Sequence, residues 1–415
     1  MTEKLAESLP EVHNSDAARL PIRDKRFWFC LALSLLVGLT INLIPVTFKV
    51  FQKLFRAGYE MQGRTEALYF VGALVGSLLA GAVTSRTGPS LSARAGLALG
   101  SLGCFLIGSA QNFSMLQAGC LLMGLGSVWL SIIYGTVIAE CFQTVRQRVF
   151  AAVNLTMAIS GTLAPMGLGR YVSTAWLEWG WPWWIPYVSL AAIFLLCQLV
   201  VPSIPRKPPA QHSEPIALGS LLRSAALWLI GLGTILHGIG QMGAVVWLAR
   251  LYEGRLGLSE SQVGMMISTN LFGFITGRII LTRYGGRLPD RVLLGCSACT
   301  GSIFYLLTIM TGEHHLGLLF IYLAGIGMSG DAISLQSFTA LRFSEAAPKA
   351  FAFTQALGHM GAAFGPYFIG FVGDRSGTLE QAVWIVPITI GTLSLLGFGW
   401  QLTDRLKAGA KPQPA

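Results

Sequence analysis

Residues 325–343 read GIGMSGDAISLQSFTALRF, and residues 124–142 read GLGSVWLSIIYGTVIAECF. Both stretches begin with Gly-x-Gly and end with Phe at the same length, so the offset from Phe142 to Phe343 is 201 residues. The same offset recurs along the chain at Phe150 and Phe351, at Pro165 and Pro366, and at Gly169 and Gly370. Self-similarity at one fixed offset predicts that the chain contains two copies of one helical unit.

The composition is typical of a membrane protein. Hydrophobic residues make up 53% of the 415 residues and charged residues only 12%, whereas soluble proteins carry about 25% charged residues. An apolar run of roughly 20 residues is long enough to cross a bilayer as a helix. The sequence therefore predicts an all-α polytopic membrane protein with twelve transmembrane helices, roughly at residues 27–48, 64–84, 91–111, 114–140, 147–171, 183–202, 226–250, 260–282, 288–311, 316–342, 348–373 and 380–403.

Several function classes are disfavoured by the same residues. The net charge of +10 does not indicate a nucleic-acid partner, because the basic residues are spread over short loops instead of forming a patch. Cys296 and Cys299 form a CxxC without a second such pair or a neighbouring His, so we expect no metal and no cofactor. The chain has no P-loop, HExxH or GxSxG motif in a span, and we therefore expect that it is not an enzyme.

The distribution of Lys and Arg predicts the orientation. If both termini lie on one side, that side carries 20 of the 29 basic residues and the other side carries 8. Cytoplasmic loops are enriched in basic residues, so we expect cytoplasmic termini in the cell (inner) membrane. The predicted organisation is an N-terminal tail (1–26), a six-helix bundle (27–202), a Pro-rich linker (203–224), a second six-helix bundle (225–404) and a C-terminal tail (405–415).

Two pseudo-symmetric six-helix bundles with cytoplasmic termini are the architecture of the major facilitator superfamily, which the chain resembles from about residue 25 to 405. The superfamily's loop motif between spans two and three, G-x-x-x-D-R-x-G-R-R, appears here as GAVTSRTGPS. Gly81, Arg86 and Gly88 match it, but Ser85 replaces the acid. The resemblance implies transport by rocking of two halves around a central cavity, and we expect a monomer.

Spans seven and eight look most like the fucose-permease type of sugar–proton symporter. The resemblance is carried by GIGQMGAVVWLARLYE at residues 238–253 and by NLFGFITGR at residues 270–278. In that branch, acids in the first and fourth spans carry proton coupling. Here those spans offer Asn42 and Tyr134 instead, so coupling of that kind does not carry over to these positions.

Asp331 is an acid inside the tenth span. An ionisable residue within a span is a functional-site hypothesis by default, because it is costly there. A rise of about 1.5 Å per residue from His315 places Asp331 near or past the midplane, at the depth of substrate sites in this architecture. The aligned residue of the first half is Leu130. We assign Asp331 to solute binding or proton coupling; the alternative is an acid paired with Arg278 or His359.

His237 and Gln241 are spaced by four residues, which places them on one face of the seventh span. The neighbouring glycines permit a helix break or a close approach. We predict that both line the cavity, although Gln241 could instead bind a backbone carbonyl. Further predicted solute contacts, each of which could instead serve helix packing, are Asn42, Tyr134, Asn270, Gln336 and His359.

Charged residues at the cytoplasmic ends of the spans predict an inner gate, with interfacial anchoring as the alternative. They are Glu140, Arg146, Arg148, Arg278 and Arg342.

The function predicted is secondary active transport of a small polar solute, a sugar or an organic acid, by alternating access, with Asp331 as the proton-coupling group. The expected partners are the solute and the lipid bilayer. An alternative is a proton-antiport exporter of drugs or metabolites. Exporters of the superfamily tend to carry G-x-x-x-G-P-x-x-G-G in span five, where this chain has GTLAPMGLG. A different class is a membrane receptor that binds solute without flux.

Overall fold

The computed structural model describes residues 20–142, 146–204, 221–284, 289–343 and 347–409, and these residues form helices joined by short turns. The predicted tails and the linker lie largely outside the described residues. The first half comprises α1 (Lys25–Ile41), η2 (Pro45–Thr47), α2 (Phe48–Phe55), α3 (Tyr59–Thr87), α4 (Pro89–Gly108), α5 (Phe113–Cys141), α6 (Arg146–Arg170), η3 (Tyr171–Trp176), α7 (Ile185–Cys197) and η4 (Gln198–Val200). The second half comprises α9 (Ala225–Leu256), α10 (Glu260–Tyr284), α11 (Asp290–Met310), α12 (His314–Met328), α13 (Asp331–Arg342), α14 (Ala347–Ser376), α15 (Leu379–Ala382) and α16 (Ile385–Gly409).

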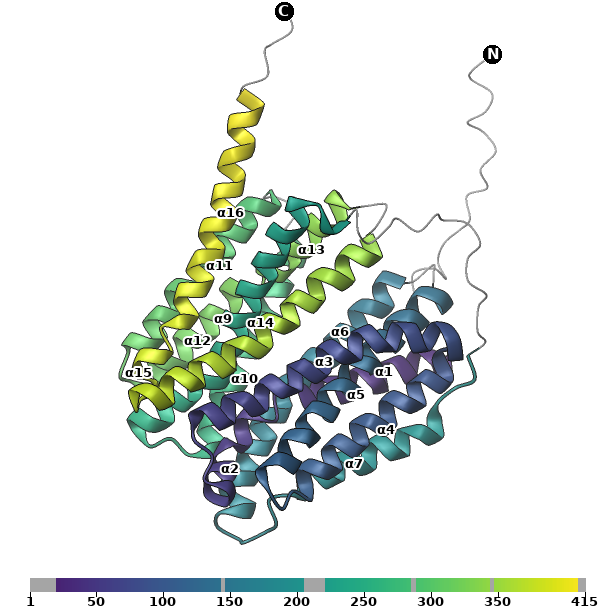
Figure 1. The fold of residues 1–415 in the computed structure, drawn as a ribbon, viewed down its shortest axis with the longest axis vertical. Helices are drawn as coiled ribbons and strands as arrows, with labels where there is room; N and C mark the ends of the chain where they lie inside the picture. Colours follow the sequence, from purple (N-terminus) through teal and green to yellow (C-terminus); the bar gives the residue numbers. More distant parts are fainter. Residues whose placement is uncertain (1–19, 143–145, 205–220, 285–288, 344–346, 410–415) are drawn as a thin grey trace, which may run out of the picture.

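The two halves form separate bundles. Figure 1 shows the purple-to-blue helices of the first half grouped apart from the green-to-yellow helices of the second. In chain order they make twelve spans, confirming the predicted fold class. Within the described residues, nine spans are long and apolar enough to cross a membrane by composition alone. The other three are α6, α7 and α14; α6 and α14 carry internal prolines and pack between the bundles.

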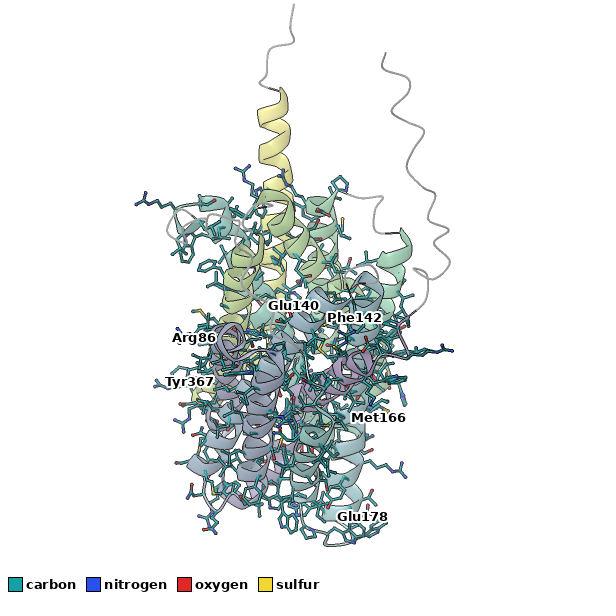
Figure 2. All side chains as sticks on the ribbon, turned by 90° about the vertical axis from the view of Figure 1, so that its right-hand side faces the viewer. Arg86, Glu140, Phe142, Met166, Glu178 and Tyr367 are labelled. Atoms are coloured by element: carbon teal, nitrogen blue, oxygen red, sulfur yellow. The ribbon has the colours of Figure 1, made fainter. Side chains whose placement is uncertain are left out.

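The two ends of the bundles can be distinguished by the helix termini. We call the end at which α1 begins and α5 ends the terminal face, and the end at which α3 begins and α14 ends the opposite face. In Figure 2, Glu140 and Phe142 at the end of α5 lie far from Glu178, which follows η3 at the opposite face.

Glycines let the bundles approach each other closely near the opposite face. Helix α3 packs against α14, and α6 packs against α10. A Cβ atom on Gly63 would overlap the carbonyl oxygen of Pro366, and a Cβ atom on Gly264 would overlap the carbonyl oxygen of Pro165. Gly63 and Gly264 are 201 residues apart, as the prolines are, so the two contacts are copies of each other. We call these reciprocal contacts the glycine seal.

Span ten is broken in the middle. The predicted segment 316–342 corresponds to two helices, because α12 ends at Met328 and α13 begins at Asp331. The Ser297 hydroxyl on α11 bridges the break: it donates to the carbonyl of Gly327 and accepts from the backbone N–H of Gly330 at 3.0 Å. The related helix of the first half, α5, is continuous through Leu130. The break therefore coincides with the acid that distinguishes the two copies.

Ser297→Ala should destabilise the protein, because it leaves buried backbone groups at this break without partners. Losing a buried hydrogen bond costs about 1–3 kcal/mol, so we expect the apparent melting temperature of the purified protein to fall by a few degrees. The matched control is Ser131→Ala, since the hydrogen bond of the Ser131 hydroxyl within the described residues goes to the carbonyl of Val128 in its own helix. Equal melting temperatures for the two variants would contradict a bridging role for Ser297.

Span one is also interrupted, whereas span seven is not. Helix α1 ends at Ile41, and the chain passes through the 3₁₀ turn η2 into α2. Asn42 caps the end of α1 and donates to the carbonyl of Gly161 on α6 at 3.2 Å. In span seven the glycines serve close packing instead of a break: α9 is continuous, and a Cβ atom on Gly238 would meet the carbonyl oxygen of Gly358 at 2.5 Å.

Candidate functional site

A cavity of about 240 Å³ lies on the terminal-face side of the glycine seal. Helices α9, α10, α13 and α14 supply most of its wall, and the first half contributes only Ile41 and Phe70. None of the lining residues, all from the described part of the chain, is an Asp or Glu. The polar side chains that line it are Thr234, His237, Gln241, Arg278, Gln336, Thr339, Thr354, Gln355 and His359.

The cavity brings together residues that lie far apart in the sequence. Gln241 and His237 face it from α9, Gln336 from α13 and His359 from α14. The Nδ1 atom of His359 has no hydrogen-bond partner among the described residues. Amide groups can both donate and accept hydrogen bonds, and imidazole can do the same or carry a charge. The wall therefore offers a hydroxylated or charged solute several polar contacts.

Asp331 lies behind this wall. Its side chain is 0% exposed, and its Oδ2 atom is 3.5 Å from Nδ1 of His237, which is within ion-pair distance. Neither carboxylate oxygen has a hydrogen-bond partner in the described part of the chain. Asp331 therefore faces His237, with which it would form an ion pair when the imidazole is protonated, and it forms no ion pair with either sequence-based alternative, Arg278 or His359. His237 contacts both the buried acid and the cavity, because it also belongs to the cavity wall.

The start of α13 provides a favourable position for an anion. Asp331 is the first residue of that helix, and the positive end of a helix dipole stabilises a nearby negative charge. Ser334, one turn further along, has a buried hydroxyl oxygen with no partner among the described residues. A broken span that presents a helix N-terminus near the cavity is a common arrangement in secondary transporters.

Arg278 is the one cationic residue, other than the histidines, that lines the cavity within the described residues. It lies on α10, six residues before the end of that helix at the terminal face. The side chain is exposed, and no ion pair joins it to a carboxylate in the described part of the chain. A guanidinium without a protein partner is suited to bind a carboxylate of a solute.

Three predicted contact residues do not line the cavity. Asn42 bonds Gly161, as described above. Asn270 is fully buried and donates to the Ile321 carbonyl at 2.9 Å and to the Tyr305 hydroxyl at 3.2 Å, which ties α10 to α12 and α11. The Tyr134 hydroxyl on α5 lies 3.9 Å from the sulfur atom of Met157 on α6. Each of these side chains serves helix packing in this conformation.

Four of the predicted gate residues lie near the ends of their helices at the terminal face, whereas the fifth, Arg278, lines the cavity. Glu140 is half-buried near the end of α5, and Arg342 is exposed at the end of α13. Arg146 begins α6, but its side chain and that of Arg148 lie outside the described residues. The gate at this face stays a prediction.

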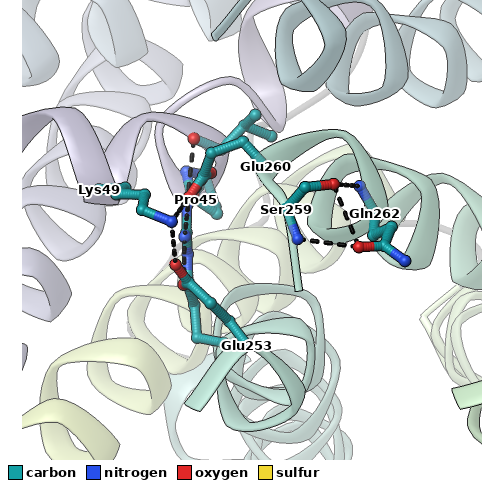
Figure 3. Close-up of polar contacts among 8 residues, drawn as sticks. Pro45, Lys49, Glu253, Ser259, Glu260 and Gln262 are labelled. Carbon is teal, nitrogen blue, oxygen red and sulfur yellow. Dashed lines mark hydrogen bonds and ion pairs between the residues drawn. The ribbon is translucent and has the colours of Figure 1, made fainter. Parts of the chain in front are cut away.

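A charged network closes the opposite face instead (Figure 3). Arg250 on α9 is buried and pairs with Glu260 at 2.9 Å and with Glu253 at 2.6 Å. It also donates to the carbonyl of Pro45 in the first half at 2.6 Å. Lys49, likewise from the first half, lies 3.2 Å from Glu253. Buried charges are costly unless they are paired and hydrogen-bonded, and this network satisfies its charges by joining the two bundles.

A second polar contact reinforces the same face. The carboxylate of Asp374, near the end of α14, accepts hydrogen bonds from the backbone N–H groups of Tyr59 and Glu60, both at 2.8 Å. These groups are at the start of α3, where backbone donors lack helical partners and favour an anion. The described residues thus hold the bundles together at the opposite face, and the cavity lies on the other side of this closure.

One buried acid escaped the sequence analysis. Glu66 on α3 is 1% exposed, and its Oε2 atom has no hydrogen-bond partner among the described residues. The rule that singled out Asp331, that a charge within a span is a functional hypothesis, also applies to Glu66. Because it lies two residues after Arg64, at the expected start of the span, its sequence position indicated a residue at the membrane surface. Helix α3 in fact begins at Tyr59, so Glu66 lies two turns inside.

The comparisons with known proteins agree with this architecture. The family model of the Major Facilitator Superfamily matches residues 30–259 and 230–414. The uncharacterized MFS-type transporter YdgK of Bacillus subtilis is 25% identical over 387 residues, covering 88% of this chain and 93% of the relative. Among solved structures, the nucleoside transporter NupG has a TM-score of 0.73 at 15% identity, covering 91% of this chain and 99% of that chain. The fucose:proton symporter FucP of E. coli has a TM-score of 0.62 at 18% identity, covering 90% of this chain and 97% of that chain. Because the family model matches both halves, the chain belongs to the major facilitator superfamily.

Proposed function

We propose that this protein is a secondary active transporter that moves a small polar solute by alternating access, and that an organic acid suits its cavity best. The observation that carries this proposal is the charge of the wall: Arg278 lines the cavity without a protein carboxylate, together with His237 and His359. No acid lines it among the described residues. A solute carboxylate would compensate this positive charge, whereas a cationic solute would be repelled.

A sugar is the second candidate. Three glutamines, Gln241, Gln336 and Gln355, line the cavity and can bind hydroxyl groups as donors and acceptors. Two proteins of similar fold are named as transporters of hydroxylated solutes, the fucose:proton symporter and the nucleoside transporter. At such low identity these two proteins indicate a shared fold and not a shared solute. We therefore favour an organic acid over a sugar, because Arg278 forms no ion pair with a carboxylate among the described residues.

The closed opposite face supports alternating access. A transporter must seal one side while the other admits solute, and the Arg250 network and the glycine seal join the bundles at one face only of the described structure. The excess of basic residues on the side of the termini assigns the terminal face to the cytoplasm. On this assignment the conformation faces inward. A monomer stays the expected state of the protein.

Proton coupling would run through the pair of Asp331 and His237. A solute anion in the cavity contacts the imidazole, and the imidazole faces the acid at 3.5 Å. Solute binding can therefore alter the charge next to Asp331 without touching it. Uptake into proteoliposomes of organic acids, sugars and amino acids, with and without a pH gradient, tests the proposal. Binding without flux for every solute would favour the receptor, and pH-driven efflux of apolar drugs would favour the exporter.

Arg278→Gln should weaken the binding of an anionic solute. Hydrogen bonds to charged groups contribute about 1.5–3 kcal/mol, so we expect the dissociation constant to rise about ten- to hundredfold. Isothermal titration calorimetry with the best organic acid from the uptake panel measures this change. Arg94→Gln is the control, because Arg94 is exposed on α4 and lies outside this cavity. An unchanged affinity in Arg278→Gln, or a best substrate that carries no charge, would contradict the organic-acid assignment.

A further inference from the structure

Glu66 has surroundings that no structural role explains. Its side chain is 1% exposed, Oε2 accepts no hydrogen bond in the described part of the chain, and no ion pair joins the acid to a cation there. A structural carboxylate in a protein interior is normally paired or hydrogen-bonded. A buried acid that has neither an ion pair nor a hydrogen bond does not stabilise the fold, which points to a functional role.

The groups around Glu66 do not supply a positive charge. The ionisable neighbours that interact with it are Tyr69 on the same helix, Cys120 on α5 and Tyr187 on α7. On α4, Cys104 interacts with two of these neighbours, Tyr69 and Cys120. Tyr and Cys are neutral near pH 7, so none of these groups would stabilise an ionised Glu66. The closed environment is therefore compatible with the acid only when it carries its proton.

The helix opposite, α14, contributes further ionisable groups along α3. His359 and Tyr367 line an apolar groove between the two helices together with Ala67 and Phe70, and the carboxylate of Asp374 bonds the start of α3. His359 forms no ion pair with Glu66 within the described residues, and neither Tyr367 nor Asp374 can supply a positive charge. Because α3 and α14 belong to different bundles, these are the groups that change position when the bundles separate.

The position of Glu66 on α3 connects it to the glycine seal. Gly63 and Phe70 are three residues before and four residues after Glu66, so the three share one side of the helix. Gly63 contacts Pro366 of α14, and Phe70 lines both the cavity and the groove. Separation of α3 from α14 would therefore remove part of the cover over this side of the helix and admit water.

We propose that Glu66 is a proton-binding site of the N-terminal half, occupied when the opposite face is closed and released when α3 and α14 separate. The step is simple protonation: the carboxylate takes up one proton from a hydronium ion of the solution at the opposite face, which leaves a neutral carboxylic acid and a water molecule. Closing the seal over an ionised Glu66 would bury an uncompensated charge, which is costly. Proton binding is thus a condition for closure. This inference rests on the proposed alternating access, but it requires neither a particular solute nor coupling at Asp331.

The test is a distance measurement across the opposite face in nanodiscs. Spin labels carried on an unnatural amino acid at Gln52 and Ser376, both exposed and one in each half, leave the seven native cysteines in place. In the otherwise unchanged protein, we expect the short-distance population to fall as the pH rises. In Glu66→Gln the short distance should persist at every pH, and in Glu66→Asp the pH dependence should return. A pH dependence unchanged in Glu66→Gln would overturn the proposal.

Infrared spectroscopy gives a second, independent readout. The C=O stretching band of a protonated carboxyl should be present in the unlabelled protein at low pH, weaker in Glu66→Gln and shifted in Glu66→Asp. Identical spectra for the three proteins would overturn the proposal even if Glu66→Gln disturbed folding. Neither measurement uses transport. A failed uptake panel together with a positive spin-label result would reject the proposed solute and leave the proton site in place.

Discussion

Asp331→Asn is expected to abolish the accumulation of solute driven by a pH gradient while leaving solute exchange across the membrane close to normal. Asparagine preserves the size of the side chain next to His237 but cannot bind and release a proton. For electroneutral symport of one proton with one solute, each pH unit of gradient supports about tenfold accumulation. The variant should lose all of this accumulation, because its exchange no longer involves the proton. Proteoliposomes with an imposed pH gradient, compared with counterflow at equal pH, separate the two quantities.

Asp290→Asn is the matched control for this experiment. Asp290 is also the first residue of a helix, α11, but it lies at the terminal face, where Ser337 donates to it. Its replacement should leave pH-driven accumulation unchanged. If Asp331→Asn accumulates solute as well as the control does, Asp331 is not the coupling group. Loss of exchange as well as accumulation would point to a structural role at the break between α12 and α13.

The repeat predicted the fold because it reports on helices that occupy equivalent places in two bundles. The offset of 201 residues relates Pro165 to Pro366 in sequence, and in the structure each proline carbonyl faces a glycine of the other bundle. The sequence did not indicate which glycines would make these contacts. A glycine in a span is compatible with lipid, with a helix neighbour or with a turn, and only the packing of the bundles decides between them.

The break in span ten could not be predicted from the sequence for a related reason. Ser329 and Gly330 lie in an apolar run that reads like one helix, and Gly is frequent in transmembrane helices. The interruption depends on Ser297, which belongs to another helix and satisfies the backbone groups that the break exposes. Tertiary contacts of this kind leave no local pattern in the sequence.

The candidate site was predicted in part. His237, Gln241, Gln336 and His359 line the cavity, whereas Asn270 is tied to a neighbouring helix. An amide in a span has the same local pattern in both cases, because it can bind a solute or serve as a link between helices. The choice depends on how each helix is rotated in its bundle, which the apolar pattern of a buried span does not define.

Gly63→Trp is expected to shift the protein into the conformation that is open at the opposite face and to stop net transport. A side chain at this position would overlap the backbone carbonyl of Pro366, which cannot move without displacing α14. Overpacking of a tight contact typically costs about 1–3 kcal/mol, occasionally more, and the penalty applies only while the seal is closed. Reversing a two-state population from 1:99 to 99:1 takes about 5.5 kcal/mol, so a penalty of about 3 kcal/mol would bring a population that is 99% closed to roughly equal shares, and a more severe backbone clash would make the open form dominant. Gly264→Trp should act in the same way, because its contact with Pro165 is the equivalent one.

The spin-label pair at Gln52 and Ser376 measures this shift directly, as a change from the short to the long distance at constant pH. The control is Gly81→Trp on the same helix, because a Cβ atom at Gly81 would meet no atom of the described residues within 4 Å. It should keep the distance distribution and the uptake rate of the unchanged protein. If Gly63→Trp also keeps the short distance, the glycine seal does not hold the opposite face closed, and the Arg250 network must do so alone. If only one of the two glycine variants opens the face, the two contacts have the same geometry but contribute different free energies to closure. The two halves would then differ in function at the glycine seal, as they differ in sequence at Asp331.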